Sequence, residues 1–242
     1  MRKSKLLLIS NSFWAIPLVF IFRFINLFKN ICLVKIRSDR FGHFAPDGAE
    51  QVARYQIKDT KIIFYIFDWY ICNKQWAKML KQALPVYNFL RPVYFWNEFL
   101  PGGKNITQIG AKTLSRDTEL LYTKFNVKLP FDKSENHEAI SWMKSKGWNV
   151  GEPFYCILIR DSAYLKNISS FKGSDWSYHD YRDSKLKTYY KSISWLADQG
   201  VWVIRMGKIV SGPLKIKNKR IIDFPFEKEK SDLIDIWLFS NC

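Results

Sequence analysis

Arginine stands at the carboxyl end of three apolar, strand-like segments of this 242-residue chain: Arg37, Arg160 and Arg205. A guanidinium group can donate two charge-assisted hydrogen bonds at once to phosphate oxygens. One arginine at a strand end is more often a solvated edge residue. Arg160 and Arg205, however, belong to one expected β-α-β unit, and the ends of parallel strands meet at the same edge of a sheet. The spacing therefore predicts a site for a diphosphate at that edge.

Small and polar residues follow these two arginines. Arg160 opens the sequence Arg-Asp-Ser-Ala-Tyr, and Arg205 opens the sequence Arg-Met-Gly-Lys. We expect Arg160 to carry most of the anion binding, with Arg205 and Lys208 in support. Arg182, in the loop before the next helix, is a weaker candidate. The predicted binding residues are Arg160, Asp161, Ser162, Tyr164, Arg182, Arg205, Gly207 and Lys208.

The segment after the first strand holds a second set of reactive side chains. His43 follows Gly42 and is the one histidine of three in a segment expected to line a crevice. A histidine there can take a proton from a hydroxyl group near neutral pH, with Asp47 as the alternative base. The competing interpretation is that His43 only hydrogen-bonds within its turn. Both interpretations stay open at this point.

Strand and helix signals alternate along the chain, which predicts an α/β fold. An Asp132-x-x-Glu135 capping box and Ser184 mark two helix starts, and Pro46 at a first helical position marks another. Residues 85–131 carry few clear signals. The predicted strands are 31–36, 61–69, 154–160, 201–205 and 220–224, and the predicted helices are 46–56, 73–84, 132–147, 185–199 and one that opens at Ser231.

The composition bounds the class of protein and its partners. Hydrophobic residues make up 48% of the chain and aromatic residues 17%, which excludes disordered and collagen-like classes. The 38 basic and 22 acidic residues give a net charge of +16, which favours nucleic acid, anionic lipid or phosphate-bearing substrates as partners. The four cysteines form no CxxC pair and the three histidines lie far apart, so the sequence predicts reduced thiols and no metal site.

Residues 1–30 are basic and apolar. Three basic residues precede an apolar stretch over residues 6–22, which is marginal for a spanning helix because polar residues and a proline interrupt it. Arg23, Asn26 and Asn30 then fall on one face of a helix whose other faces are apolar. This pattern predicts a helix that lies on an anionic cytoplasmic membrane surface. The alternative is an N-terminal helix packed on its own domain.

Five sequence segments resemble a family of bacterial glycosyltransferases of the GT-B type, loosely related to heptosyltransferases and O-fucosyltransferases. Together they fall within residues 37–242, and the second and fourth are the most specific. One position departs from the family, because Leu158 stands where relatives commonly carry histidine. The segments are Arg40-Phe-Gly-His-Phe44, Arg160-Asp-Ser-Ala-Tyr164, Tyr181-Arg182, Gly200-Val-Trp-Val-Ile-Arg-Met-Gly207 and Ser231-Asp-Leu-Ile-Asp235.

This resemblance implies an α/β, GT-B-like chain of two Rossmann-like domains. After a membrane-associated helix at 1–30, an acceptor-side domain would span 31–149 and a nucleotide-sugar donor domain 150–242. The implied activity is transfer of a sugar from a nucleotide-sugar donor to a glycan or lipid-linked acceptor in surface polysaccharide assembly. It needs no cofactor, because GT-B enzymes neutralise the leaving diphosphate with basic side chains and helix N-termini rather than with a bound metal. The implied place is the inner face of the cell membrane.

The resemblance also assigns roles to single residues. Arg160 would neutralise the diphosphate, while Asp161 and Tyr164 would organise the loop or contact the donor sugar. Heptosyltransferases place an aspartate base in a comparable glycine-containing turn, which makes His43 an attractive base here.

Two further expectations concern the end of the chain and rival functions. Family members continue past the point that matches Cys242, so we expect 150–242 to be an incomplete domain whose terminal apolar stripe, residues 233–239, stays uncovered. An inactive remnant or a membrane-associated scaffold is therefore the main alternative function. A nucleic-acid-binding protein is a weaker one, because the basic residues are spread along the chain and the aromatic residues fall mostly in apolar segments.

Overall fold

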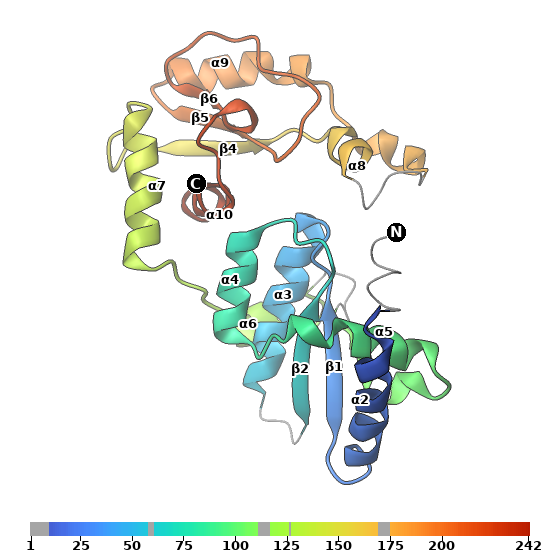
Figure 1. The fold of residues 1–242 in the computed structure, drawn as a ribbon. Helices are drawn as coiled ribbons and strands as arrows, with labels where there is room; N and C mark the ends of the chain where they lie inside the picture. Colours follow the sequence, from blue (N-terminus) through green and yellow to red (C-terminus); the bar gives the residue numbers. More distant parts are fainter. Residues whose placement is uncertain (1–9, 58–60, 111–116, 126, 169–174) are drawn as a thin grey trace. The chain divides into compact units, whose positions relative to one another are not determined.

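The computed structural model describes the whole chain except residues 1–9, 58–60, 111–116, 126 and 169–174 (Figure 1). The chain divides into two compact units, Met1–Pro130 and Phe131–Cys242. Each unit contains one three-stranded parallel sheet covered by helices. The predicted α/β class is confirmed. The division falls at residue 130, ahead of the predicted helix 132–147, because that helix packs into the core of the second unit.

The sheet of the first unit has the strand order β2-β1-β3. The strands are β1 (Ile31–Ile36), β2 (Ile62–Phe67) and β3 (Thr107–Ile109), and all pair in parallel. The strand predicted at 31–36 is confirmed, and the one predicted at 61–69 is shorter at both ends. The sequence left β3 unread, because three residues are too few to show a pattern.

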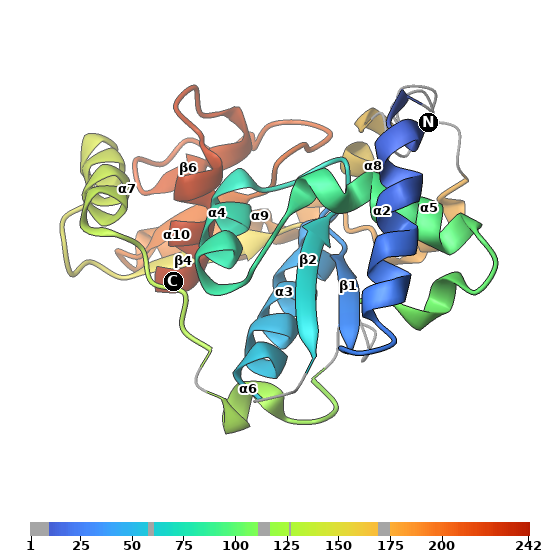
Figure 2. The same cartoon turned by 60° about the horizontal axis from the view of Figure 1, so that its bottom comes forward.

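Helices cover both faces of this sheet (Figure 2). On one face, α3 (Phe41–Gln56) and α4 (Lys74–Ala83) pack against β1 and β2. On the other face, α2 (Ser12–Ile25) and α5 (Arg91–Phe99) do so. Shorter helical segments complete the unit: η1 (Asn88–Leu90), η2 (Gly103–Asn105) and α6 (Leu121–Lys124).

Helix α3 begins five residues earlier than predicted. Its first turn starts at Phe41, and the backbone N–H groups of His43 and Phe44 donate to the carbonyl of Arg40. Pro46 therefore lies inside the helix, where its ring nitrogen has no hydrogen to donate to the carbonyl of Gly42. The consequence is that His43 lies in the first turn of a helix and not in a glycine-containing loop.

The N-terminal helix packs on its own unit. Ala15 and Val19 of α2 are fully buried, and the ring of Phe22 stacks on that of Phe64 in β2. Arg23 points inward, where its guanidinium donates to Asn97 Oδ1 at 2.9 Å. The prediction that Arg23 lies on a polar, solvent-facing side of this helix is therefore wrong. Among the described residues, no helix has the length and apolar character needed to cross a membrane.

The sheet of the second unit has the order β4-β5-β6, again in parallel. The strands are β4 (Phe154–Leu158), β5 (Trp202–Met206) and β6 (Ile221–Asp223). One face carries α7 (Lys133–Ser145) and α10 (Asp232–Asn241), and the other carries α9 (Tyr190–Asp198). The remaining segments are α8 (Ala163–Asn167), η4 (Ser177–Arg182), η5 (Leu186–Tyr189) and η6 (Phe224–Phe226).

The helix predicted over 185–199 has a different start. Leu186–Tyr189 forms a 3₁₀ turn, and the α-helix begins only at Tyr190. Ser184 does not cap it; instead the backbone N–H of Ser184 donates to the carbonyl of Arg160 at 3.0 Å. The three other predicted starts are confirmed, because Asn73 caps α4, Asp132 and Glu135 form a complete capping box, and Ser231 caps α10.

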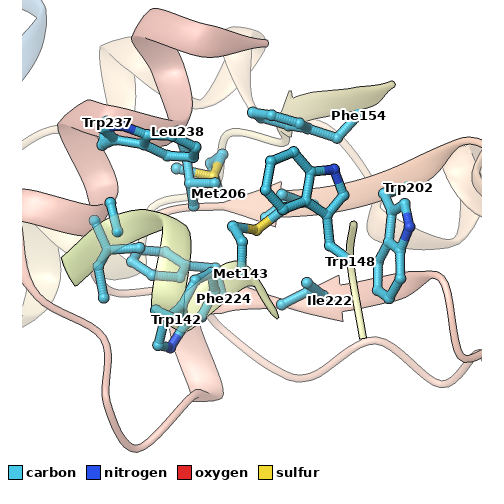
Figure 3. Packing of buried hydrophobic residues seen from close by; sticks show 13 residues of the cluster. Trp142, Met143, Trp148, Phe154, Trp202, Met206, Ile222, Phe224, Trp237 and Leu238 are labelled. Carbon is cyan, nitrogen blue, oxygen red and sulfur yellow. The ribbon is translucent and has the colours of Figure 1, made fainter. Parts of the chain in front are cut away.

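The terminal apolar stripe is covered within the second unit, contrary to our expectation. Ile234, Trp237 and Leu238 of α10 lie in one core with residues of α7, β4, β5 and β6 (Figure 3). The indole of Trp237 stacks on the ring of Phe154, and its Nε1–H donates to Asn136 Oδ1 at 3.1 Å. Both faces of the three-stranded sheet are thus packed, and the expectation that this stripe stays uncovered is wrong.

Candidate functional site

The carboxyl ends of all three strands of the second sheet hold one short segment, residues 211–214. Asp161, after β4, accepts hydrogen bonds from the backbone N–H and the hydroxyl of Ser211, both at 2.8 Å. Arg205, in β5, donates from Nη1 to the carbonyl of Gly212 at 2.7 Å. Asp223, at the end of β6, accepts from the N–H of Leu214 at 2.7 Å. We call this segment the edge loop.

Arg205 lies in the interior and not at the surface of this edge. Its side chain is 1% exposed, and Nη1 lies 3.3 Å from Oδ1 of Asp223, the residue paired with it across β5 and β6. Its Nε has no hydrogen-bond partner among the described residues. The structure therefore uses Arg205 to neutralise Asp223 and to position the edge loop.

Arg160 and Lys208 are two basic residues of this edge that solvent reaches. Their side chains are 37% and 38% exposed. Arg160 Nε lies 3.4 Å from Oδ1 of Asp183, and Lys208 Nζ lies 2.8 Å from Oδ1 of Asp232, the first residue of α10. Each cation is thus paired with a carboxylate that a more highly charged anion could displace.

Gly207 sets the path of the chain between β5 and the edge loop. Its φ of +141° is a conformation that side chains with a Cβ rarely adopt. A Cβ at this position would also lie 2.8 Å from Cγ1 of Val210. The chain therefore requires glycine here to place Lys208 after the strand.

The other predicted binding residues are more scattered. Ser162 and Tyr164 lie at the start of α8, whose first N–H, that of Ala163, donates to Oδ1 of Asp161 at 2.9 Å. Arg182 is exposed and interacts with its neighbour Tyr181, with its Nε 2.8 Å from the phenol oxygen. The structure thus links Asp161 and Arg205 through the edge loop, and shows no such link for Arg182 among the described residues.

In the first unit, the predicted bases His43 and Asp47 meet at Arg37. Arg37 Nε donates to Oδ2 of Asp47 at 3.1 Å, and Arg37 Nη2 lies 3.1 Å from Nδ1 of His43. An arginine only donates, so Nδ1 must accept and the neutral ring carries its hydrogen on Nε2. Burial, followed by the charges of Arg37 and Arg40, lowers the pKa of His43 below 6.5. In this arrangement His43 offers a donor, and Asp47 is fully buried.

Asp68 is a candidate base that the sequence analysis missed. It follows β2 directly and was read as part of a longer strand. Its Oδ2 accepts from the N–H of Ser38 at 3.2 Å, and Lys35 Nζ lies 3.8 Å from its Oδ1. Burial raises the pKa of Asp68 above 3.8 in spite of the nearby Lys35. The signal that could have revealed it is its position immediately after an apolar run, where parallel sheets place ligand-binding residues.

An aromatic and cationic cluster adjoins Asp68. Trp69 stacks on Phe95 of α5 with 6.5 Å between the ring centroids. The guanidinium of Arg91 lies 5.3 Å from the centroid of the Trp69 ring and donates to the carbonyl of Phe67 at 2.7 Å. A partly exposed indole beside a charged group is a surface on which the apolar face of a sugar ring can stack. Within the described residues, no group of three or more metal-ligating side chains gathers at either sheet edge or elsewhere.

The carboxyl edges of the two sheets present different charged groups. The second sheet presents partly exposed cations, and the first presents a partly buried arginine-histidine-aspartate group beside Asp68, in which Asp47 is the fully buried member. In comparisons with known proteins, no family model matches this chain, and neither a curated protein nor a solved structure gives a match.

Proposed function

We propose that this protein is a glycosyltransferase of the GT-B type that uses a nucleotide-sugar donor for the assembly of a surface glycan. The observation that carries the proposal is the pair of partly exposed cations, Arg160 and Lys208, at the ends of neighbouring parallel strands. The motifs that resemble the GT-B family include both residues or lie next to them. The donor diphosphate would bind at this edge.

A diphosphate would replace the carboxylates that now face the two cations. Asp183 and Asp232 are each 24% exposed, so both can turn toward solvent when a phosphate group takes their place. The edge loop adds rigidity, because Asp161, Arg205 and Asp223 fix it from three strands. Cations held in place before the reaction stabilise the charge that develops on the leaving diphosphate without needing to reorganise. Arg205 serves here as a positioning residue.

The acceptor would bind at the first unit, with Asp68 as the base. A carboxylate with a raised pKa takes a proton more readily than an ordinary one, while the lone pair on Nδ1 of His43 already accepts from Arg37. Asp68 would take the proton of the acceptor hydroxyl as its oxygen attacks the anomeric carbon. The bond from that carbon to the diphosphate oxygen breaks, and the nucleoside diphosphate leaves with the electron pair. His43 and Asp47 would then hold Arg37 in place.

Calorimetry with nucleoside diphosphates tests the donor site. Across uridine, guanosine, adenosine and cytidine diphosphates, we expect one to bind. Arg160→Ala should weaken binding of that ligand by about 1.5–3 kcal/mol, the usual contribution of a hydrogen bond to a charged group. Arg160→Lys should recover only part of this loss, because the two-pronged hydrogen bond is gone. Lys208→Ala should also weaken binding.

The matched control is Lys144→Ala, which removes the same charge from an exposed position in the last turn of α7, ahead of the amino end of β4. It should leave the affinity within about twofold of the wild type, since a distant surface charge is screened. Equal losses of affinity in Lys144→Ala and Lys208→Ala would show that the effect comes from net charge alone. Absence of binding by all four diphosphates would contradict the proposed function.

A further inference from the structure

The outward side of α2 and of the turn after it is apolar, although it faces solvent. Six of its aromatic or aliphatic side chains are more than half exposed: Phe13 at 78%, Leu27 and Phe28 at 75%, Phe24 at 64%, Phe20 at 56% and Ile21 at 51%. An ordinary surface helix carries polar residues on this side. We call these residues, together with Phe99, the α2 patch.

The inward side of α2 packs against the first unit, so the α2 patch is a separate, outward side of the helix. Ala15 and Val19 are fully buried there, and Arg23 is held by the segment after α5. Arg23 Nη1 donates to the carbonyl of Pro101 at 2.7 Å, and Nη2 donates to that of Leu100 at 3.4 Å. Phe99, 79% exposed, therefore belongs to the same end of the unit. A helix that is apolar on all sides needs an apolar partner on its outer side.

Positive charge borders the patch. Lys29 follows Phe28 directly, and Lys104 follows the segment that holds Arg23; both are exposed. Glu98, also exposed, is the acidic residue of this segment and accepts a hydrogen bond from Thr107. Three more basic residues precede the helix in the sequence, in the part that the structure does not describe, and the whole chain carries +16. Aromatic rings with lysines beside them match the boundary between lipid headgroups and acyl chains.

We propose that the α2 patch binds the surface of an anionic lipid bilayer, with α2 lying in the headgroup region. The helix has 14 residues, about 21 Å at 1.5 Å per residue, against an apolar bilayer thickness of roughly 30 Å. A helix of this length fits along the membrane surface better than across the bilayer. A second copy of the chain is a poorer occupant, because pairing two such patches would bring Lys29 and Lys104 close to their own copies. This inference does not depend on the proposed enzymatic activity.

Vesicle flotation of the full chain tests the proposal. The probes are vesicles of phosphatidylcholine alone and vesicles that also contain phosphatidylglycerol. The wild type should float with the anionic vesicles. The double variant F24S/F28S should partition about tenfold less, because two exposed rings no longer enter the lipid. The variant K29Q/K104Q should lose about fivefold per lysine on anionic vesicles and change little on neutral ones.

The control L158S/F226S removes two apolar side chains, 63% and 51% exposed, from the second unit, and should float like the wild type. All four substituted apolar residues are exposed, so thermal unfolding should show every variant folded. Equal flotation of F24S/F28S and the wild type would overturn the proposal, as would wild type that stays out of the anionic vesicles. Wild-type dimers that F24S/F28S converts to monomers, with no flotation of either, would make the patch an interface between copies instead.

Discussion

Arg160 lies two residues beyond the end of β4, whereas Arg205 lies within β5 and pairs with Ile157, and their side chains are 37% and 1% exposed. The buried guanidinium needs a buried counter-charge, which Asp223 supplies from the adjacent strand. A buried ion pair contributes little net stability, although removing one partner leaves a costly isolated charge. At the residue scale, exposure therefore separates the arginine that can meet a ligand from the one that holds the site together.

Burial of His43, together with the positive charge of Arg37, lowers its pKa and makes stability depend on pH. The pKa of His43 is lowered in the folded protein, so below 6.5 the unfolded chain binds the proton more readily than the folded one. The free energy of unfolding should therefore fall as pH drops from 6.5 through the folded pKa. His43→Asn keeps an acceptor for Arg37 and removes this titration. Urea midpoints at about pH 7.5 and about pH 5 should differ less in the variant than in the wild type.

Other groups also titrate in this range, so only the difference between variant and wild type is diagnostic. A variant that lost the fold would show a lower midpoint at both pH values. An identical pH dependence in His43→Asn and wild type would contradict the lowered pKa of His43 in the folded protein.

At the scale of elements, helix starts could be predicted wherever a side chain caps the backbone. The capping box at Asp132 and the serine cap of α10 are local interactions, and both form as predicted. The helix start predicted at Pro46 is wrong: proline is common at a first helical position, but this helix begins five residues before it. The start predicted at Ser184 is also wrong, because a 3₁₀ turn at Leu186–Tyr189 precedes the α-helix. Propensity patterns do not encode such tertiary effects.

The cap at Ser231 should have a measurable effect that Ser184 lacks. The hydroxyl of Ser231 accepts from the N–H of Ile234 at 3.2 Å. Ser231→Ala should therefore lower the free energy of unfolding by about 1 kcal/mol. Ser184→Ala is the matched control; its hydroxyl caps no helix, and its effect should stay within about 0.5 kcal/mol. Chemical denaturation measures both, and a smaller loss in Ser231→Ala than in Ser184→Ala would contradict the assignment.

At the scale of the whole molecule, the sequence predicted two parallel sheets and the places where polar groups leave them. Strand ends can be read from apolar runs, which located Arg160, Arg205 and the segment after β1. The burial of Arg205 could not be read, because it depends on Asp223 and on the edge loop 211–214, whose hydrogen bonds link residues up to 50 positions apart. The packing of α7 against residues 234–238 could not be predicted either, because α7 lies about 100 residues earlier in the chain.

The central claim is that the carboxyl edge of the second sheet binds a nucleoside diphosphate. Amide chemical shifts of ¹⁵N-labelled full-length protein, recorded as the bound diphosphate from the calorimetric panel is added, test it most directly. The account predicts shifts concentrated at residues 160–164 and 207–212, with those residues unresponsive to the same ligand in Arg160→Ala. Shifts confined to other parts of the chain, or no shifts with any of the four diphosphates, would contradict it.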